Sequence, residues 1–403
     1  MESLIVAILR CLDPYSNRAH SFCFFSGWND QHLDLMKSLS LLSTRRRFLQ
    51  DTALTTLAAI PVASGLGAIQ ADGASERIKI GQIGTQHAHA SGKMQSLRKL
   101  RDLYEVVGVV EPDSEAREKA ERSATFKDIP FLTEEALLNT PGLQVVAVET
   151  PVRDLVKTAI RCLEADFHIH LDKPAGASMS ACRELHAVAV RQNRTIQMGY
   201  MFRYNAGFEF LFDILKKGWL GEITEVSGMI GKLGSNQLRD ELIEFPGGGM
   251  FELGCHLIDA VVTVLGKPDA VQSIVRRTKP ERDQFADNQL AVFEYSKAIG
   301  TIRCNHLDPF GSPRRQFNVT GDQGTIEIRP LEVPRARIAL DRDRGSFRKG
   351  FQDVRLARMT GRYDGSFRDL AKVIRGEKTL AWDAEHDLAV HETVLRASGM
   401  SVD

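Results

Sequence analysis

This sequence lacks the features that mark several classes of protein. Its 403 residues carry 52 Lys and Arg against 52 Asp and Glu, so no excess of positive charge favours a nucleic acid or an anionic membrane as a partner. Its six cysteines include no C-x-x-C pair, which excludes a disulfide framework and the usual zinc site. The remaining composition, 43% hydrophobic and 26% charged, is that of a globular chain with about two or three domains.

The chain also lacks an apolar run long enough to span a membrane, which takes about 20 residues. Its mildly apolar stretch, residues 52–71, is interrupted by one proline and two glycines. That stretch follows the basic segment Thr44–Gln50 and contains no acidic residue, an order typical of a twin-arginine export signal. An amphipathic surface helix after a basic turn is the alternative. We therefore expect residues 1–74 to be a leader recognised by the twin-arginine export machinery, and the mature protein to be periplasmic or otherwise extracytoplasmic.

Apolar runs alternate with helical stretches between residues 75 and 198. The predicted strands are residues 78–83, 106–110, 145–149, 168–171 and 195–198. The predicted helices are residues 114–122, 153–165 and 181–192. This alternation is typical of a Rossmann-like, doubly wound parallel sheet. Because such sheets bind ligands beyond the carboxyl ends of their strands, the residues that follow each strand are the expected binding residues.

The first strand is followed by an incomplete dinucleotide fingerprint. When the first glycine of G-x-G-x-x-G is placed on Gly84, the other two glycine positions hold Gln86 and His89. Such loops bind phosphate mainly through backbone N–H groups and a helix start, so Gln86 is compatible with binding although its Cβ occupies a crowded place. Glu111 suits an acceptor for the adenosine ribose hydroxyls and would repel a 2′-phosphate, which favours NAD over NADP. The residues expected to contact this cofactor are Gly84, Thr85, Gln86, His87, Glu111, Thr150, Pro151 and Lys173.

The pattern changes from residue 199 to strands that follow one another without intervening helices. The predicted strands are residues 223–233, 271–276, 289–293, 300–304, 316–320 and 324–328. Residues 366–374 and 384–397 are predicted helices, and the basic segment 335–348 is expected to be a solvated loop. We therefore predict that residues 199–403 form an α+β domain with a mainly antiparallel sheet.

Several ordered motifs resemble the glucose–fructose oxidoreductase / inositol dehydrogenase (Gfo/Idh/MocA) family. Within residues 146–174, a strand ends in Thr-Pro, a helix follows, and a second strand ends in Asp-Lys-Pro, where the family has Glu-Lys-Pro. The later matches are Gly199-Tyr200, Arg203-Tyr204, the glycines at 247–249, and a helix with Glu252, Gly254, His256 and Asp259. The resemblance covers nearly all of residues 77–400. It implies an NAD(P)-dependent oxidoreductase of sugars, polyols or related carbohydrates, and an open second sheet that packs in a homo-oligomer.

Glu252 and His256 are four residues apart and are expected to share one helix face. A carboxylate one turn from an imidazole can orient the ring and raise its basicity. Oxidation of an alcohol needs such a group to take the hydroxyl proton. We predict His256 as the general base and Glu252 as its orienting partner, and the family's Asp-x-x-x-His pair implies the same roles. An exposed helical ion pair is the alternative.

Lys173 follows a parallel strand and precedes a proline. At that position its ammonium can hydrogen-bond the reacting oxygen and stabilise negative charge as it develops, which is the role of the family's lysine. A surface lysine at a strand end is the alternative. The residues expected to line the substrate cleft are Tyr200, Arg203, Tyr204 and Asp259, although Tyr204 suits the core equally well.

Two H-x-H pairs raise the question of a metal site. They are His87 with His89 and His168 with His170. In an extended strand or loop the side chains of alternate residues point to the same side, so both histidines of a pair could bind one metal ion. No carboxylate or cysteine close in sequence completes either pair, so no metal is predicted. His87 and His89 are expected to touch phosphate or nicotinamide instead.

Two other functions remain open on the sequence. The first is an NAD-dependent glycoside-cleaving enzyme that oxidises a sugar, eliminates the aglycone and then reduces the product. The second is a non-catalytic carbohydrate-binding relative, if Gln86 and His89 exclude the dinucleotide. Twin-arginine export moves folded proteins, so a tightly held cofactor loaded before export fits the enzymatic functions.

Overall fold

The computed structural model describes residues 76–243 and 245–403. The predicted export signal, residues 1–74, lies outside these ranges. Among the residues that the structure describes, no helix has the length and apolar character needed to cross a membrane.

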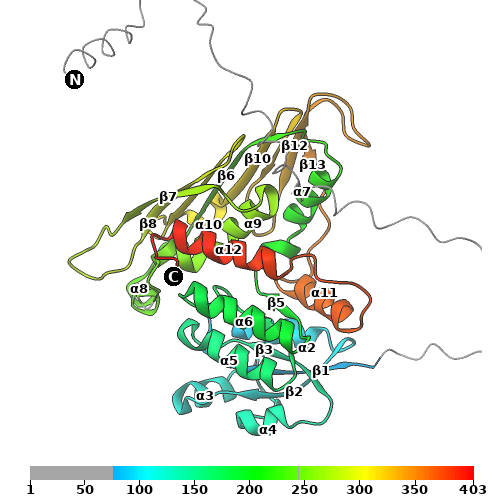
Figure 1. The fold of residues 1–403 in the computed structure, drawn as a ribbon, viewed down its shortest axis with the longest axis vertical. Helices are drawn as coiled ribbons and strands as arrows, with labels where there is room; N and C mark the ends of the chain where they lie inside the picture. Colours follow the sequence, from blue (N-terminus) through cyan, green and yellow to red (C-terminus); the bar gives the residue numbers. More distant parts are fainter. Residues whose placement is uncertain (1–75, 244) are drawn as a thin grey trace, which may run out of the picture. The chain divides into compact units, whose positions relative to one another are not determined.

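A five-stranded parallel sheet forms the first part of the fold, in the order β2-β1-β3-β4-β5 (Figure 1). Its strands are β1 (Ile78–Ile83), β2 (Tyr104–Val110), β3 (Leu143–Val148), β4 (His168–Leu171) and β5 (Ile196–Met198). β1 pairs in parallel with both β2 and β3, so the chain runs outward from β1 in two directions. Ligands bind at such a switch point in open α/β sheets. The predicted Rossmann-like sheet is confirmed.

Helices connect these strands. They are α2 (Ala90–Lys99), α3 (Ser114–Glu121), α4 (Glu134–Leu138), α5 (Val152–Glu164) and α6 (Met179–Arg191). Asp113 and Ser178 accept backbone N–H hydrogen bonds at the first turns of α3 and α6, as N-cap residues do. The sequence analysis missed α2, because its buried face includes Lys93 and Ser96 and these polar residues obscure the apolar period.

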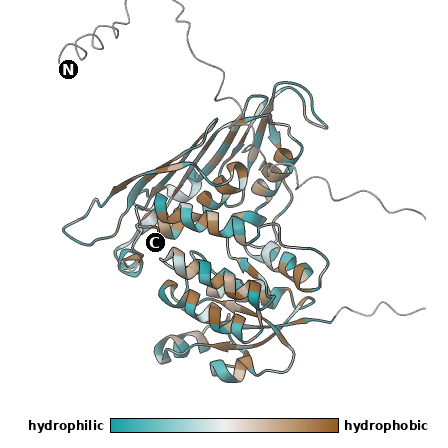
Figure 2. Cartoon of the chain, in the orientation of Figure 1, coloured by the Kyte–Doolittle hydropathy of each residue, from teal (hydrophilic) through white to brown (hydrophobic). Residues whose placement is uncertain are grey.

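An eight-stranded sheet follows, in the order β13-β12-β11-β10-β6-β9-β8-β7. Its strands are β6 (Ile223–Gly231), β7 (Ala270–Arg276), β8 (Asn288–Glu294), β9 (Ile299–Asn305), β10 (Gln316–Gly321), β11 (Gly324–Ile328), β12 (Ala336–Leu340) and β13 (Gly350–Val354). The neighbouring strands are antiparallel except β6 and β9, which are parallel. Hydrophobic and hydrophilic residues alternate along the long strands (Figure 2), because one face covers the core. The predicted open, mainly antiparallel sheet is confirmed.

The prediction of a solvated loop over residues 335–348 is wrong for its first part. Residues 336–340 form β12, in which Ala336, Ile338 and Leu340 are buried and Arg337 between them is exposed. This is the period of two expected of a half-buried strand. The surrounding charges concealed it in a segment of only five residues.

The helices of the second part lie along one face of the larger sheet and reach the first sheet. They are α7 (Ala206–Lys216), α8 (Asn236–Leu242), α9 (Cys255–Leu265), α10 (Gly311–Arg314), α11 (Asp364–Ile374) and α12 (Ala384–Ala397), with a 3₁₀ turn at Met201–Tyr204 and a π-helical turn at Met250–Gly254. α9 packs against β6 and β9, α12 packs against α9 and α6, and α11 packs against α2. The last two helices therefore pack against helices of the first part of the fold, α11 against α2 and α12 against α6.

Candidate active site

The loop after β1 is shaped by Gly84, which has a φ of 95°. A Cβ at this position would lie 2.5 Å from the carbonyl of Glu149 and from the backbone N of Thr150. Only glycine avoids both the unfavourable φ and this contact. The loop after β1 therefore lies directly against the end of β3, where the fingerprint places the dinucleotide.

Two adjoining cavities open at these strand ends. One, of about 330 Å³, is lined by Gly84, Glu111 and Thr150 among others, and one of about 370 Å³ is lined by His87, Lys173 and Glu252 among others. Gln86, Pro151 and Arg153 line both. All the residues predicted to contact the cofactor except Thr85 line one cavity or the other. The glycine cradle, the acidic residue after β2 and the paired cavities fit a dinucleotide, with its adenosine half in the smaller cavity.

Glu111 lies in the smaller cavity as predicted, but its carboxylate is occupied by the loop itself. Oε2 accepts hydrogen bonds from the backbone N–H and the hydroxyl of Thr85, at 2.8 and 2.7 Å. Oε1 accepts from Gln86 Nε2 and from the backbone N–H of Asp113, both at 3.1 Å. A ribose hydroxyl therefore reaches this carboxylate only in place of one of the two side-chain donors.

Lys173 connects the end of β4 to the π-helical turn. Its side chain is almost fully buried, at 2% exposure, and Nζ donates a 2.6 Å hydrogen bond to the carbonyl oxygen of Glu252. Gly249, directly before this turn, lets the ring of His306 approach from the other side, since a Cβ at this position would lie 2.4 Å from that ring. The lysine is thereby held at the wall of the larger cavity.

The expected contact between Glu252 and His256 is absent among the described residues. The two oxygens of Glu252 lie 3.3 Å from Lys232 Nζ and 3.3 Å from His306 Nε2. Burial alone raises the pKa of this carboxyl, but the hydrogen bond from His306 and the charge of Lys232 outweigh it and hold the pKa well below its ordinary value. The prediction that Glu252 orients His256 is therefore wrong, because the carboxylate instead pairs with Lys232 and His306, which directly follow β6 and β9.

His256 lies behind the cavity wall. It is 1% exposed, does not line either cavity, and its Nδ1 has no hydrogen-bond partner among residues 76–243 and 245–403. Its ring centroid is 5.7 Å from that of Phe202 and 6.1 Å from those of Tyr200 and His89. Burial, followed by the charge of Lys173, lowers the pKa of His256 well below its ordinary value, so the ring is neutral.

Asp172 joins several groups that the sequence analysis did not connect. Its Oδ2 lies 2.8 Å from His87 Nδ1, 3.0 Å from His89 Nδ1 and 3.0 Å from Lys93 Nζ, and Oδ1 accepts from the backbone N–H of Lys173 at 2.6 Å. Burial raises the pKa of this carboxyl, but the charges of His87, Lys93 and His89 outweigh it and hold the pKa well below its ordinary value. Asp172 is therefore an ionised carboxylate at the centre of this cluster.

Asp172 also supplies a carboxylate beside His87 and His89, the H-x-H pair that has no carboxylate close to it in sequence. The ligand atoms of His87, His89 and Asp172 all lie within 4.8 Å of one another, a spacing that a metal ion could bridge. However, the ammonium of Lys93 is 3.0 Å from the same carboxylate oxygen, and a second cation there would be repelled. The cluster favours acid–base chemistry over metal binding.

The residues predicted to line the substrate cleft are buried elsewhere. Arg203 Nη2 lies 2.6 Å from Asp259 and 2.6 Å from Asp387 of α12, and the hydroxyl of Tyr204 donates to Asp369 at 3.0 Å. Within the described residues, neither these nor Tyr200 line the two strand-end cavities. The prediction is corrected: the 3₁₀ turn directs Arg203 toward α9 and α12, where a buried guanidinium needs carboxylate partners.

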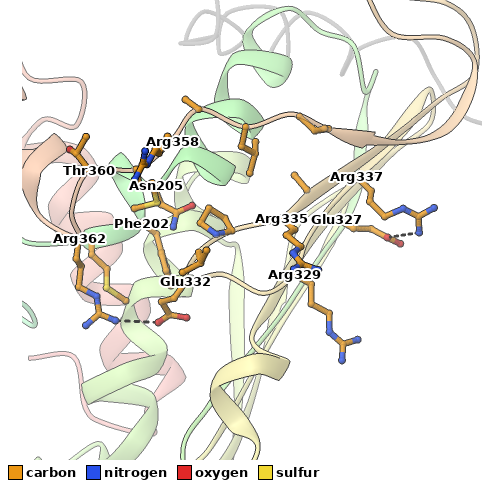
Figure 3. Close-up of a pocket in the computed structure, with 18 of the residues that line it drawn as sticks. Phe202, Asn205, Glu327, Arg329, Glu332, Arg335, Arg337, Arg358, Thr360 and Arg362 are labelled. Atoms are coloured by element: carbon orange, nitrogen blue, oxygen red, sulfur yellow. Dashed lines mark hydrogen bonds and ion pairs between the residues drawn. The ribbon is translucent and has the colours of Figure 1, made fainter.

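A third cavity, of about 1130 Å³, lies away from the strand ends, at the outer strands β11 to β13 (Figure 3). Five of its 20 lining residues are arginines, of which Arg362 and Arg337 turn toward Glu332 and Glu327. None of its lining residues belongs to the ends of β1 to β4. Size alone therefore does not identify the active site in this protein.

Comparisons with known proteins agree with this arrangement. Residues 78–200 match the family described as "Oxidoreductase family, NAD-binding Rossmann fold", and residues 208–327 match the "GFO/IDH/MocA C-terminal domain". The uncharacterized oxidoreductase YdgJ of Escherichia coli is 26% identical over 268 residues, which are 66% of this chain and 75% of YdgJ. The scyllo-inositol 2-dehydrogenase (NADP(+)) IolW of Bacillus subtilis is 23% identical over 291 residues, which are 66% of this chain and 79% of IolW.

The fold also occurs in solved structures. Levoglucosan dehydrogenase, in complex with NADH and levoglucosan, has a TM-score of 0.70 at 14% identity, over 80% of this chain and 98% of that one. The two matched family stretches cover more than half of the chain; the first contains the parallel sheet, and the second contains most of the larger sheet but not β12 and β13. The chain therefore belongs to the GFO/IDH/MocA family of oxidoreductases and contains an NAD-binding Rossmann domain.

Proposed function

We propose that this protein transfers hydride between a nicotinamide dinucleotide and a hydroxyl group of a sugar, polyol or related carbohydrate. The observation that carries the proposal is the position of Lys173, which is buried at a strand end, lines the 370 Å³ strand-end cavity and adjoins the loop for the cofactor. The names of two similar proteins support the substrate class, since one is an inositol dehydrogenase and the other a levoglucosan dehydrogenase. Lys232, Asp240 and Glu241 also line this cavity and suit a substrate rich in hydroxyl groups.

Lys173 is prepared to bind the reacting oxygen. An ammonium has three N–H donors, and one of them is used on the carbonyl of Glu252 at 2.6 Å. That hydrogen bond fixes the direction of the side chain, and the other two donors remain for the oxygen of the substrate. When bound, the nicotinamide supplies the two-electron acceptor or donor for the carbinol carbon. The ammonium stabilises negative charge on the oxygen as the carbonyl forms.

NAD is the proposed cofactor in preference to NADP. The carboxylate of Glu111 is at the end of β2, where the adenosine ribose binds in Rossmann folds. A ribose diol can donate to it, whereas a 2′-phosphate is repelled by its charge. Binding of NADP more tightly than NAD would contradict this preference.

Glycoside cleavage with the same cofactor is the second candidate function. It is favoured by the presence of more acid–base groups around the cavity than one hydride transfer requires, namely His87, His89 and Asp172 beside Lys173. Release of free sugar from a glycoside with no net NADH would favour this function over a simple dehydrogenase.

The test combines cofactor identification with a substrate panel. Native mass spectrometry of the protein purified after export identifies any nucleotide it retains, and a panel of sugars and polyols is then followed at the nicotinamide absorbance. We expect NAD to be found and at least one carbohydrate to be oxidised or reduced. A protein that binds neither NAD nor NADP would be a non-catalytic carbohydrate-binding relative.

Export and oligomer formation are proposed on separate grounds. The basic segment and the mildly apolar stretch in residues 44–71 support export by the twin-arginine machinery to an extracytoplasmic compartment. The larger sheet exposes Ile274 and Ile299 by 45% and 58%, which supports packing of this sheet in a homo-oligomer. Fractionation of cells and light scattering of the purified protein test the two proposals.

A further inference from the structure

We propose that His89, held by the buried carboxylate of Asp172, takes up and returns the hydroxyl proton of the substrate, the role predicted for His256. This inference rests on the proposed function, because it assigns the proton acceptor for the same reaction. It also gives a reason for His89 at the third glycine position of the fingerprint, because an acid–base group at this position of the cofactor loop can reach the substrate.

The contacts of His89 define its tautomer. Its Nδ1 lies 3.1 Å and 3.0 Å from the two oxygens of Asp172. An ionised carboxylate only accepts hydrogen bonds, so the single proton of the neutral ring is on Nδ1 and Nε2 carries the lone pair. The same arrangement prepares the base in serine hydrolases. A carboxylate thus fixes the ring of His89, whereas Nδ1 of His256 has no such partner among the described residues.

His89 also has access to the substrate and the required charge state. Its side chain is 15% exposed and lines the 370 Å³ strand-end cavity together with Lys173, whereas His256 does not line it. Burial lowers the pKa of His89 to about 4, although Asp172 opposes the change, so the ring is neutral at pH 7 and able to accept a proton. The titratable or charged groups around it are Asp172, Lys173, His87, Lys93, His256 and Tyr363.

The proton step can be written in full for the oxidation direction. The O–H bond of the substrate breaks, its proton passes to Nε2 of His89, and the electron pair remains on oxygen. That pair forms the carbonyl as the hydride leaves carbon for the two-electron acceptor, which a bound nicotinamide would supply, and the ammonium of Lys173 stabilises the oxygen during the change. In the reduction direction, Nε2 returns the proton. The imidazolium formed in between is stabilised by Asp172, which stays ionised.

Lys93 explains why Asp172 stays available for this role. Its ammonium lies 3.0 Å from Asp172 and 2.6 Å from Glu149, and none of the three side chains is exposed. Burial lowers the pKa of Lys93, but the charges of Asp172 and Glu149 outweigh it and raise the pKa above its ordinary value. The permanent positive charge keeps Asp172 ionised and opposes a metal ion at the same oxygen.

The test compares three variants with one control. His89→Gln, His256→Gln and Asp172→Asn are compared with His168→Gln, whose side chain lies at the opposite end of β4 from Lys173. General bases contribute about 10²–10⁴-fold to rate. We expect His89→Gln to lower kcat at least 100-fold and His256→Gln less than about tenfold, with the dissociation constant for NAD unchanged within about threefold in both. A larger loss in His256→Gln than in His89→Gln overturns the assignment, as does loss of NAD binding in His89→Gln.

A second measurement does not depend on turnover. Long-range proton–nitrogen NMR of the histidine rings reports which nitrogen of His89 carries the proton. We expect the proton on Nδ1, and we expect Asp172→Asn to remove this preference while His168→Gln leaves it. A proton on Nε2, or a stoichiometric transition metal in the purified protein, overturns the inference. If the wild-type protein binds NAD but oxidises no carbohydrate, the proposed function fails, and the NMR result still decides whether His89 is held as a base.

Discussion

Replacement of Lys93 by methionine tests how the acid–base cluster is held together. Methionine keeps an unbranched side chain but removes the ammonium that faces Glu149 at 2.6 Å and Asp172 at 3.0 Å. Removing one partner of a buried ion pair costs about 3–5 kcal/mol, because an uncompensated charge remains buried. At about 1.5 °C per kcal/mol for a domain of this size, the Tm falls by on the order of 5 °C.

The loss of folding stability in the Lys93→Met variant is expected to increase with pH. Burial raises the pKa of Glu149 well above its ordinary value even with Lys93 present, since the charge of Lys93 only partly opposes it. Without the ammonium this folded-state pKa rises further above the unfolded value of about 4. Such a carboxyl binds its proton more tightly when folded, so the variant is most stable below that unfolded pKa and loses stability as pH rises. The difference from wild type is therefore larger at about pH 8 than at about pH 5.

Urea unfolding followed by circular dichroism at the two pH values measures this difference. The double variant Lys93→Met/Glu149→Gln removes one carboxylate together with the cation and is expected to recover at least half of the lost stability. Lys297→Met is the matched control, because the side chains of Lys297 and its partner Glu222 are 71% and 52% exposed and such exposed pairs contribute about 0–1 kcal/mol. A Lys93→Met variant as stable as wild type at about pH 8, or a double variant no more stable than the single one, would refute the buried-charge argument.

Three further outcomes are expected. Lys173→Met lowers kcat by about 10²–10³-fold with NAD affinity unchanged within about threefold, as loss of a donor to a developing oxyanion does; activity within about tenfold of wild type contradicts its role. Gln86→Gly frees Glu111 Oε1 from a 3.1 Å hydrogen bond and lowers the Kd for NAD by about 3–10-fold; calorimetry that finds weaker binding contradicts this. Gly84→Ala brings a Cβ within 2.5 Å of the Glu149 backbone and lowers the Tm measured by calorimetry, so a wild-type Tm is the contrary result.

The strands that position the site were predictable because they are buried on both faces. β1 at Ile78–Ile83 and β4 at His168–Leu171 begin and end where the sequence analysis placed them. A parallel strand covered on both sides is apolar along most of its length, so its ends are visible in the sequence. α2 and β12 were missed because polar or charged residues occupy or surround their buried positions.

The partners within the site were less predictable than the residues. Glu252 and His256 occupy one helix region, but the carboxylate bonds to Lys232 and His306, which directly follow the neighbouring strands β6 and β9 and lie far from each other in the sequence. Likewise, Asp172 contacts His89 across 83 positions of the chain. Spacing along a helix restricts which side chains share a face, and only the tertiary packing decides which of them touch. The binding of ligands at the carboxyl ends of parallel strands predicted where the site lies. The contacts of Glu252 and Asp172 depend on the tertiary structure and could not be predicted.

We propose that the cleft at Lys173 uses a nicotinamide dinucleotide to oxidise or reduce a carbohydrate. The most direct measurement is NADH formation or consumption by the purified full chain on a panel of sugars and polyols, with Lys173→Met assayed in parallel. The predicted result is turnover of at least one carbohydrate by the wild-type protein, with at least a 100-fold loss in the variant and NAD still bound. Turnover that is equal in the two proteins, or NAD binding without turnover of any carbohydrate, would contradict it.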